Sequence, residues 1–166
     1  MQLTHYNTNF IKRTFPIILV CQHISNAPNV GSLFRAADAF GVEKLIFCGE
    51  YVPLGRKMTK TSRATEKVVD FEITDNAFEV VSELKEKNYQ IIALEITTNS
   101  HPTHSIQFSK DRPIALVVGD ENFGVSEVIL NLADTIIHID MYGQNSSMNV
   151  VQATSIALYE MTKQLL

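Results

Sequence analysis

Short apolar runs alternate along this chain with segments of helical spacing, and that alternation limits the fold more than any other feature. The runs are continuous and of strand length, which is typical of strands buried on both faces of a parallel sheet. The predicted strands are residues 16–22, 44–49, 90–96, 113–119 and 135–140, and the predicted helices are residues 29–40, 74–87, 126–132 and a last one from 146 or 147 onward. This order predicts an α/β fold, a mostly parallel sheet with helices on both faces.

The length of 166 residues suits one domain, and no linker, repeat or low-complexity run divides the chain. We therefore expect a single domain over residues 1–166. With 45% hydrophobic and 19% charged residues, the composition is that of a globular protein. Neither a membrane span nor a signal peptide is apparent, so the expected location is the cytoplasm. Cys21 and Cys48 each lie in an apolar run and are expected to stay free thiols.

A basic cluster lies within residues 55–67, although the net charge of the whole chain is −4. Negative net charge argues against a nucleic-acid partner, but an average can hide a basic patch. Hydroxyl side chains are interleaved with the basic residues and can donate to phosphate oxygens. The segment is either a solvated surface loop or a loop that contacts nucleic acid. Its basic residues are Arg56, Lys57, Lys60, Arg63 and Lys67.

Motifs for common cofactors are absent. The chain has no G-x-G-x-x-G dinucleotide fingerprint, no G-x-x-x-x-G-K-[ST] phosphate loop and no G-x-S-x-G elbow. His101 and His104 form H-P-T-H, but no cysteine or carboxylate cluster joins them, so no metal site is expected. His23 and His138 adjoin strands and are expected to be structural.

Three polar segments remain, and each follows a predicted strand, where ligands bind in such sheets. The first segment, residues 29–37, begins a helix that Asn26 or Asn29 can cap, and its free amides favour an anion. Arg35 lies among apolar neighbours on that helix. Its guanidinium needs a carboxylate or a phosphate, so either a structural salt bridge or an anion site is expected.

The second segment, residues 118–126, places two glycines around two adjacent acids. Gly119 lets backbone approach a ligand closely, and Glu121 can accept from hydroxyl or amine donors. An ordinary polar turn between a strand and a helix is the alternative.

The third segment, residues 139–150, crowds amides and hydroxyls into a loop before the last helix. Ser146 or Ser147 can cap that helix, whereas capping does not explain Asn149, a poor helix former. Such crowding suits a polar ligand such as an adenosine with its ribose.

Together, and in this order, the three segments resemble the motifs of the SpoU (TrmH-like) branch of the SPOUT RNA methyltransferases. Those motifs are N-x-G-x-x-x-R-x-A, then a strand followed by G-[ND]-E-x-x-G, then S-[LM]-N-V at the last helix. All three match with agreeing spacing, and the resemblance covers about residues 16–159. Two departures are small: Asp120 stands where many members have Asn, and Met148 stands for the commoner Leu.

The resemblance implies that S-adenosylmethionine binds in a deep trefoil knot made by the C-terminal third, with no metal. It also implies a homodimer whose site lies near the interface. The last helix fits this, because Met148, Val151, Leu158 and Leu165 line one face while Val150, Ala157 and Met161 line another. The cofactor residues implied are Leu94, Glu95, Ile96, Gly119, Ile139, Ser147 and Met148.

The resemblance also implies methyl transfer to a ribose 2′-hydroxyl of RNA. The family's functional residues carry over to Asn29, Arg35, Glu121, Ser147 and Asn149. Because a guanidinium keeps its proton, our hypothesis is that Arg35 grips the adjacent phosphate and orients the hydroxyl. Glu121, Ser147 and Asn149 would position the ribose and the methyl donor.

The RNA is expected to contact Arg35 and the basic cluster through Arg56, Lys57, Lys60 and Arg63. Between tRNA and rRNA we favour tRNA, because a small unit with one basic loop can grip a compact target. Three alternatives stay open: a SPOUT enzyme that methylates a base nitrogen, a non-catalytic RNA-binding module, and an α/β ligand-binding domain unrelated to RNA.

Overall fold

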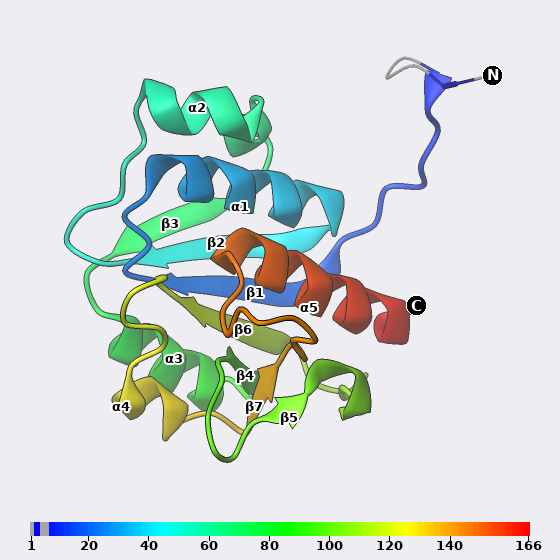
Figure 1. The fold of residues 1–166 in the computed structure, drawn as a ribbon. Helices are drawn as coiled ribbons and strands as arrows, with labels where there is room; N and C mark the ends of the chain where they lie inside the picture. Colours follow the sequence, from blue (N-terminus) through cyan, green and yellow to red (C-terminus); the bar gives the residue numbers. More distant parts are fainter. Residues whose placement is uncertain (1, 4–6) are drawn as a thin grey trace.

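The computed structural model describes residues 2–3 and 7–166, and a parallel β-sheet forms its centre (Figure 1). In the described part of the chain the sheet has seven strands, in the order β3-β2-β1-β6-β4-β7-β5, and each pair is parallel. The predicted parallel α/β fold is confirmed. The strands are β1 (Phe15–Gln22), β2 (Val42–Cys48), β3 (Phe71–Thr74), β4 (Gln90–Leu94), β5 (His101–Pro102), β6 (Ile114–Gly119) and β7 (Thr135–His138).

Helices cover both faces of the sheet, as predicted. Figure 1 shows α1 and α5 on one face, with α2 packed outside α1, and α3 and α4 on the other face. Among the described residues, no helix combines the length and the apolar character that a membrane span needs. The helices are α1 (Ala27–Ala39), α2 (Arg56–Ser62), α3 (Ala77–Glu86), α4 (Glu127–Leu130) and α5 (Val150–Leu165), with short 3-10 turns η2 (Thr65–Lys67) and η3 (Thr103–Ser105).

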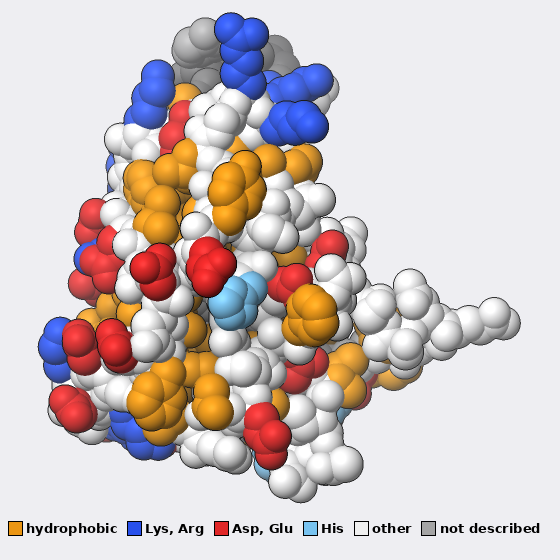
Figure 2. Space-filling model, turned by 90° about the vertical axis from the view of Figure 1, so that its left-hand side faces the viewer, with side chains coloured by type: hydrophobic (Ala, Val, Ile, Leu, Met, Phe, Trp, Pro, Cys, Tyr) orange, Lys and Arg blue, Asp and Glu red, His pale blue; other side chains and the backbone are white. Residues whose placement is uncertain are grey.

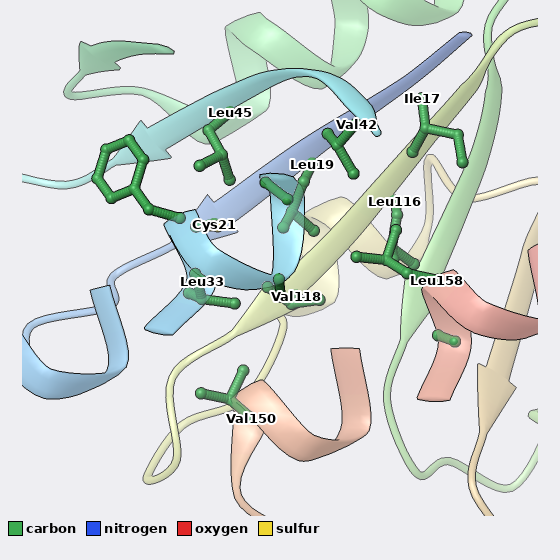
Figure 3. Close-up of a cluster of buried hydrophobic side chains, with 14 of the residues drawn as sticks. Ile17, Leu19, Cys21, Leu33, Val42, Leu45, Leu116, Val118, Val150 and Leu158 are labelled. Atoms are coloured by element: carbon green, nitrogen blue, oxygen red, sulfur yellow. The ribbon is translucent and has the colours of Figure 1, made fainter. Parts of the chain in front are cut away.

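Strand β1 lies in the middle of the sheet and supplies side chains to both hydrophobic clusters. Ile17, Leu19 and Cys21 point into the cluster under α1 and α5 (Figure 3), while Ile18 and Val20 point into the cluster under α3 and α4. Successive side chains of a strand alternate between faces, so a continuous apolar run requires cover on both sides. This explains why continuous apolar runs in the sequence predicted a sheet covered by helices on both faces.

The two cysteines are free and buried, as expected. They lie on adjacent strands but on opposite faces, because Cys21 belongs to the first cluster and Cys48 to the second. Burial raises the pKa of the Cys48 thiol to about 12, with the charge of Glu72 adding to the rise, and burial also raises the pKa of Cys21. Both thiols are therefore poor nucleophiles.

The expectation that residues 56–67 form a loop was wrong, since they form α2 followed by η2. A single apolar side chain, Met58, is buried on α2, so the helix leaves no apolar periodicity in the sequence. Arg63 and Ala64 end it in the left-handed region at φ 54° and 70°. Strands β3 and β5 were also missed. Both lie at sheet edges; β3 is only partly buried and β5 has two residues.

Helix caps were predicted with mixed success. Asn26 caps α1 by accepting from Asn29 N at 3.1 Å, one of the two caps expected, and Gly41 after α1 has left-handed backbone at φ 61°. The helix predicted from residue 74 begins later, at Ala77, and its cap is Asn76. The cap of α5 is Asn149, which accepts from Val151 N at 2.9 Å, so the serine caps and the statement that capping does not explain Asn149 were wrong.

Candidate active site

The three polar segments meet at one cluster beyond the carboxyl ends of β1 and β6. Asn149 Nδ2 donates to Glu121 Oε1 at 2.7 Å and to Asn29 Oδ1 at 3.2 Å. Asn29 Nδ2 donates to the same oxygen of Glu121 at 3.2 Å. Each residue comes from a different segment: the first turn of α1, the turn after β6 and the cap of α5. The fold therefore brings together three of the five functional residues that the resemblance implied.

Two glycines shape the turn that carries Glu121. A Cβ on Gly119 would overlap the backbone of Gly124, so this glycine lets the turn fold back onto the strand end. Gly124 is left-handed at φ 64°, and a Cβ there would overlap Glu95. Asp120 Oδ1 accepts from Asn122 N at 2.9 Å and Phe123 N at 2.6 Å, which closes the turn.

Two side-chain contacts fix this turn to the neighbouring strands. Glu95, at the end of β4, accepts from Val125 N at 2.8 Å and from Ile96 N at 2.9 Å. Gln22, at the end of β1, donates to Ser126 Oγ and accepts from Ser126 N, both at 2.9 Å. Gln22 was missed, because a single glutamine closing an apolar run carries no distinctive pattern. Its partner lies 104 residues away.

A cavity of about 460 Å³ opens beside the cluster, at the ends of β4, β6 and β7. Its walls combine apolar side chains with backbone and a few polar groups, which is typical of a small-molecule site. A smaller cavity of about 260 Å³ adjoins it on the Asn29 side, and Asp120, Glu121, Asn122 and Val150 line both. Every residue expected to hold the cofactor lines the larger cavity: Leu94, Glu95, Ile96, Gly119, Ile139, Ser147 and Met148.

Arg35 lies outside this cluster. Its side chain is exposed on α1, and among residues 2–3 and 7–166 no carboxylate pairs with it, so a structural salt bridge is not what the structure shows. One turn earlier, Gly31 contacts α2 so closely that a Cβ would overlap Thr61 Oγ1 and Met58 O. The glycine of the first motif thus seats the basic helix directly on the helix of Arg35.

Charge is unevenly distributed over the face where β1 ends. Figure 2 shows this face, with a group of Lys and Arg side chains at the top over α2, and with hydrophobic and acidic side chains below, where further basic side chains lie toward the left edge. The expected RNA contacts Arg56, Lys57, Lys60 and Arg63 all belong to α2 or its cap. No group of three or more metal-ligating side chains occurs among the described residues, and His104 lies near Asp140, with its Nδ1 3.6 Å from the carboxylate.

The two apolar faces expected of the last helix are only partly present. Val150, Ala157 and Met161 are buried as expected, but Leu158 and Leu165, placed on the other face, also pack into the core. The outward face instead presents Ile156 and Tyr159. The homodimer stays a prediction, as does the trefoil knot.

Comparisons with known proteins agree with these motifs. The sequence signature of the SpoU rRNA Methylase family matches residues 16–159. A tRNA (guanosine(18)-2′-O)-methyltransferase of Aquifex aeolicus is 35% identical over 156 residues, 92% of this chain and 72% of that protein. The crystal structure of the A. aeolicus TrmH/SpoU tRNA modifying enzyme superposes with a TM-score of 0.82 at 32% identity, over 92% of this chain and 77% of that one.

Two further relatives are longer. The 23S rRNA (guanosine-2′-O-)-methyltransferase RlmB of Vibrio parahaemolyticus is 29% identical over 91% of this chain, which spans 60% of that protein. An AdoMet-bound rRNA methyltransferase from Sinorhizobium meliloti shares the fold, with a TM-score of 0.82 at 21% identity over 90% of this chain and 57% of that one.

Proposed function

The chain belongs to the SpoU rRNA methylase family, and on that premise we propose that it transfers a methyl group from S-adenosylmethionine to a ribose 2′-hydroxyl of RNA. The observation that carries this proposal is the position of Glu121. Its carboxylate lies on the wall shared by two cavities and is held there by amides from both other motifs. A residue so placed can contact a methyl donor on one side and an acceptor on the other.

The larger cavity fits the methyl donor. Leu94, Ile139 and Met148 supply apolar walls for an adenine ring, while Gly119 leaves room for backbone contacts. S-adenosylmethionine supplies a sulfonium-bound methyl group that needs no metal to be displaced. The chain's own contribution is alignment, because an in-line displacement depends on the angle between the reacting atoms.

The smaller cavity fits the acceptor ribose. Asn29 and Asn149 both donate hydrogen bonds to Oε1 of Glu121. The other carboxylate oxygen has no hydrogen-bond partner in the described structure. That second oxygen can accept from a ribose hydroxyl. Ser147 lines the larger cavity and makes no hydrogen bond within the described residues, so its hydroxyl is available to the donor.

Arg35 and α2 are proposed to hold the RNA backbone. An exposed arginine without a carboxylate partner can bind a phosphate through two parallel hydrogen bonds. The basic residues of α2 lie on the adjoining helix, so one strand of RNA can contact both. We propose tRNA as the target rather than rRNA, because one short basic helix suits a compact RNA.

The first experiment is methyl transfer from labelled S-adenosylmethionine to bulk tRNA and, separately, to rRNA, with the modified nucleoside identified. We expect a 2′-O-methylated nucleoside from tRNA that is lost in Glu121→Ala. A methylated base would favour a base-nitrogen enzyme. Cofactor binding without transfer to either RNA would favour a non-catalytic module.

Replacing Lys57, Lys60 and Arg63 by alanine is expected to weaken RNA binding and its dependence on salt. Each lost phosphate contact lowers the slope of log K against log salt by about 0.7 to 0.9. Fluorescence anisotropy over a salt series measures both quantities. The control removes equal charge from other exposed positions, Lys87, Lys110 and Lys163. Equal binding by the two triple variants would contradict a role for α2.

A further inference from the structure

Phe123 lies in the turn after β6 and is 89% exposed. Phe10, Ile11 and Tyr142 are similarly exposed but line neither cavity, whereas Phe123 lines the larger one. Among the described residues, Phe123 belongs to neither hydrophobic cluster. The transfer proposed above does not use it. An aromatic ring that is left uncovered beside the proposed reaction site is available to a ligand.

The backbone of the turn holds Phe123 in a fixed place. Phe123 N donates to Asp120 Oδ1 at 2.6 Å, and Gly124 N donates to Asp120 O at 2.9 Å. The next residue, Val125, donates from its N to Glu95 Oε2 at 2.8 Å and so ties the turn to the end of β4. A phenylalanine side chain has two rotatable bonds, so on a fixed turn it loses little conformational entropy when a ligand covers it.

The position of Phe123 relative to Glu121 identifies which part of an acceptor it can meet. The two residues lie in the same turn, two positions apart, and two residues span at most about 7 Å. Asn122 between them lines both cavities. The base of a nucleotide is joined to the same ribose that carries the 2′-hydroxyl. A ribose bound at Glu121 therefore brings its base within reach of the ring of Phe123.

The charge of the turn favours a base over a phosphate as the ligand of Phe123. Asp120 and Glu121 precede it, Glu95 lies against the turn, and residues 119–126 contain no Lys or Arg. Carboxylates repel a phosphate, whereas a base is uncharged and can stack on an aromatic ring. A base can do so only where it is not stacked between its neighbours, as in a loop or bulge of RNA.

We propose that Phe123 stacks on the base of the nucleotide that receives the methyl group, and that this nucleotide is unpaired, with its base turned out of the RNA stack. This inference rests on the proposed function, because it needs an RNA ribose at Glu121. Every base has an aromatic face, so Phe123 contributes affinity without selecting one base. The contact is present both before and during transfer. It therefore acts on the KM for RNA more than on kcat.

The first test compares Phe123→Leu and Phe123→Tyr with the wild type in steady-state transfer to the RNA pool, bulk tRNA or rRNA, that the wild type methylates. Leucine keeps an apolar side chain but removes the ring. We expect the KM for RNA to rise roughly 5- to 100-fold, the usual value of one stacked base, with a smaller change in kcat. Tyrosine keeps the ring and should give a KM near that of the wild type.

Two controls separate this effect from damage to the fold or to the cofactor site. Affinity for S-adenosylmethionine, measured by calorimetry, and the melting temperature should be the same in all three proteins, because the side chain is exposed. Phe10→Leu makes the same substitution at a ring that is 86% exposed and lines neither cavity, and it should leave the KM for RNA unchanged.

A second measurement reports on the stacking itself. The chain contains no tryptophan, so Phe123→Trp introduces a single fluorophore at the turn, and Phe10→Trp introduces one in the N-terminal segment. S-adenosylhomocysteine replaces the methyl donor, so that no transfer occurs. Addition of the same RNA should then quench the fluorescence of Phe123→Trp and saturate with RNA binding, whereas the fluorescence of Phe10→Trp should not change.

An equal KM for RNA in Phe123→Leu and the wild type, or fluorescence of Phe123→Trp that RNA leaves unchanged, would overturn the stacking. Weaker binding of S-adenosylmethionine by Phe123→Leu with an unchanged KM for RNA would also overturn it, and would assign the ring to the cofactor. No transfer by the wild type to either RNA would instead refute the proposed function, so the two failures are distinguishable.

Discussion

Arg35→Ala is expected to lower methyl transfer on the order of 10²- to 10³-fold, the usual cost of losing one preorganised donor that positions a reacting group. Affinity for S-adenosylmethionine should not change, because Arg35 does not line the larger cavity. Its side chain is exposed and has no ion-pair partner among the described residues, so folding should be unaffected as well. The loss should therefore appear in kcat and in the KM for RNA, with an unchanged melting temperature.

Arg35→Lys distinguishes a bidentate contact with phosphate from the effect of a positive charge alone. Lysine keeps the charge but cannot present two parallel donors, so we expect it to recover only a small part of the activity. Single-turnover transfer at saturating cofactor measures this directly. Lys87→Ala, which removes an exposed cation from the end of α3, is the matched control. Near-full activity of Arg35→Lys would rule out the bidentate contact with phosphate.

The sequence predicted those parts of the fold in which local pattern and tertiary environment agree. The run that forms β1 is buried on both faces, so its apolar pattern alone identified a central strand. Helix α2 was not predicted. It packs on α1 through the buried Met58 and a close approach to Gly31, so its sequence shows no apolar periodicity. Strand β5 has two residues and exists only because β7 lies beside it.

In the site, too, the contacts between residues depend on the fold and could not be predicted from local pattern. Asn29, Glu121 and Asn149 were selected through family motifs, and no local pattern places them within hydrogen-bond distance of one another. The prediction that Asn149 does not cap was wrong, because a cap can also make a second contact: its side-chain oxygen accepts from Val151 N while its nitrogen donates to Glu121. His138 was expected to be structural because it adjoins a strand, and its contact with Ser100, 38 residues away, could not be read from a local pattern.

Gly119→Ala is expected to cost about 1–3 kcal/mol of the free energy of unfolding and to weaken S-adenosylmethionine binding at least about tenfold. The atoms nearest to the new Cβ are backbone atoms of Gly124 and Val125, which cannot rotate away as a side chain could. The turn must shift as a unit. That shift would break the bond from Val125 N to Glu95 and would carry Glu121 away from the amides of the other two motifs.

Gly143→Ala is the matched control for this prediction, because it lies in the neighbouring loop and a Cβ there meets open space. Chemical denaturation gives the free energy of unfolding of each variant, and calorimetry gives its cofactor affinity. Both variants lose the backbone freedom of one glycine, so that difference cancels between them. If Gly119→Ala bound the cofactor as tightly as Gly143→Ala, the turn would be free to move without disturbing the site. The close packing of Gly119 against Gly124 would then not be what holds Glu121 between the two cavities.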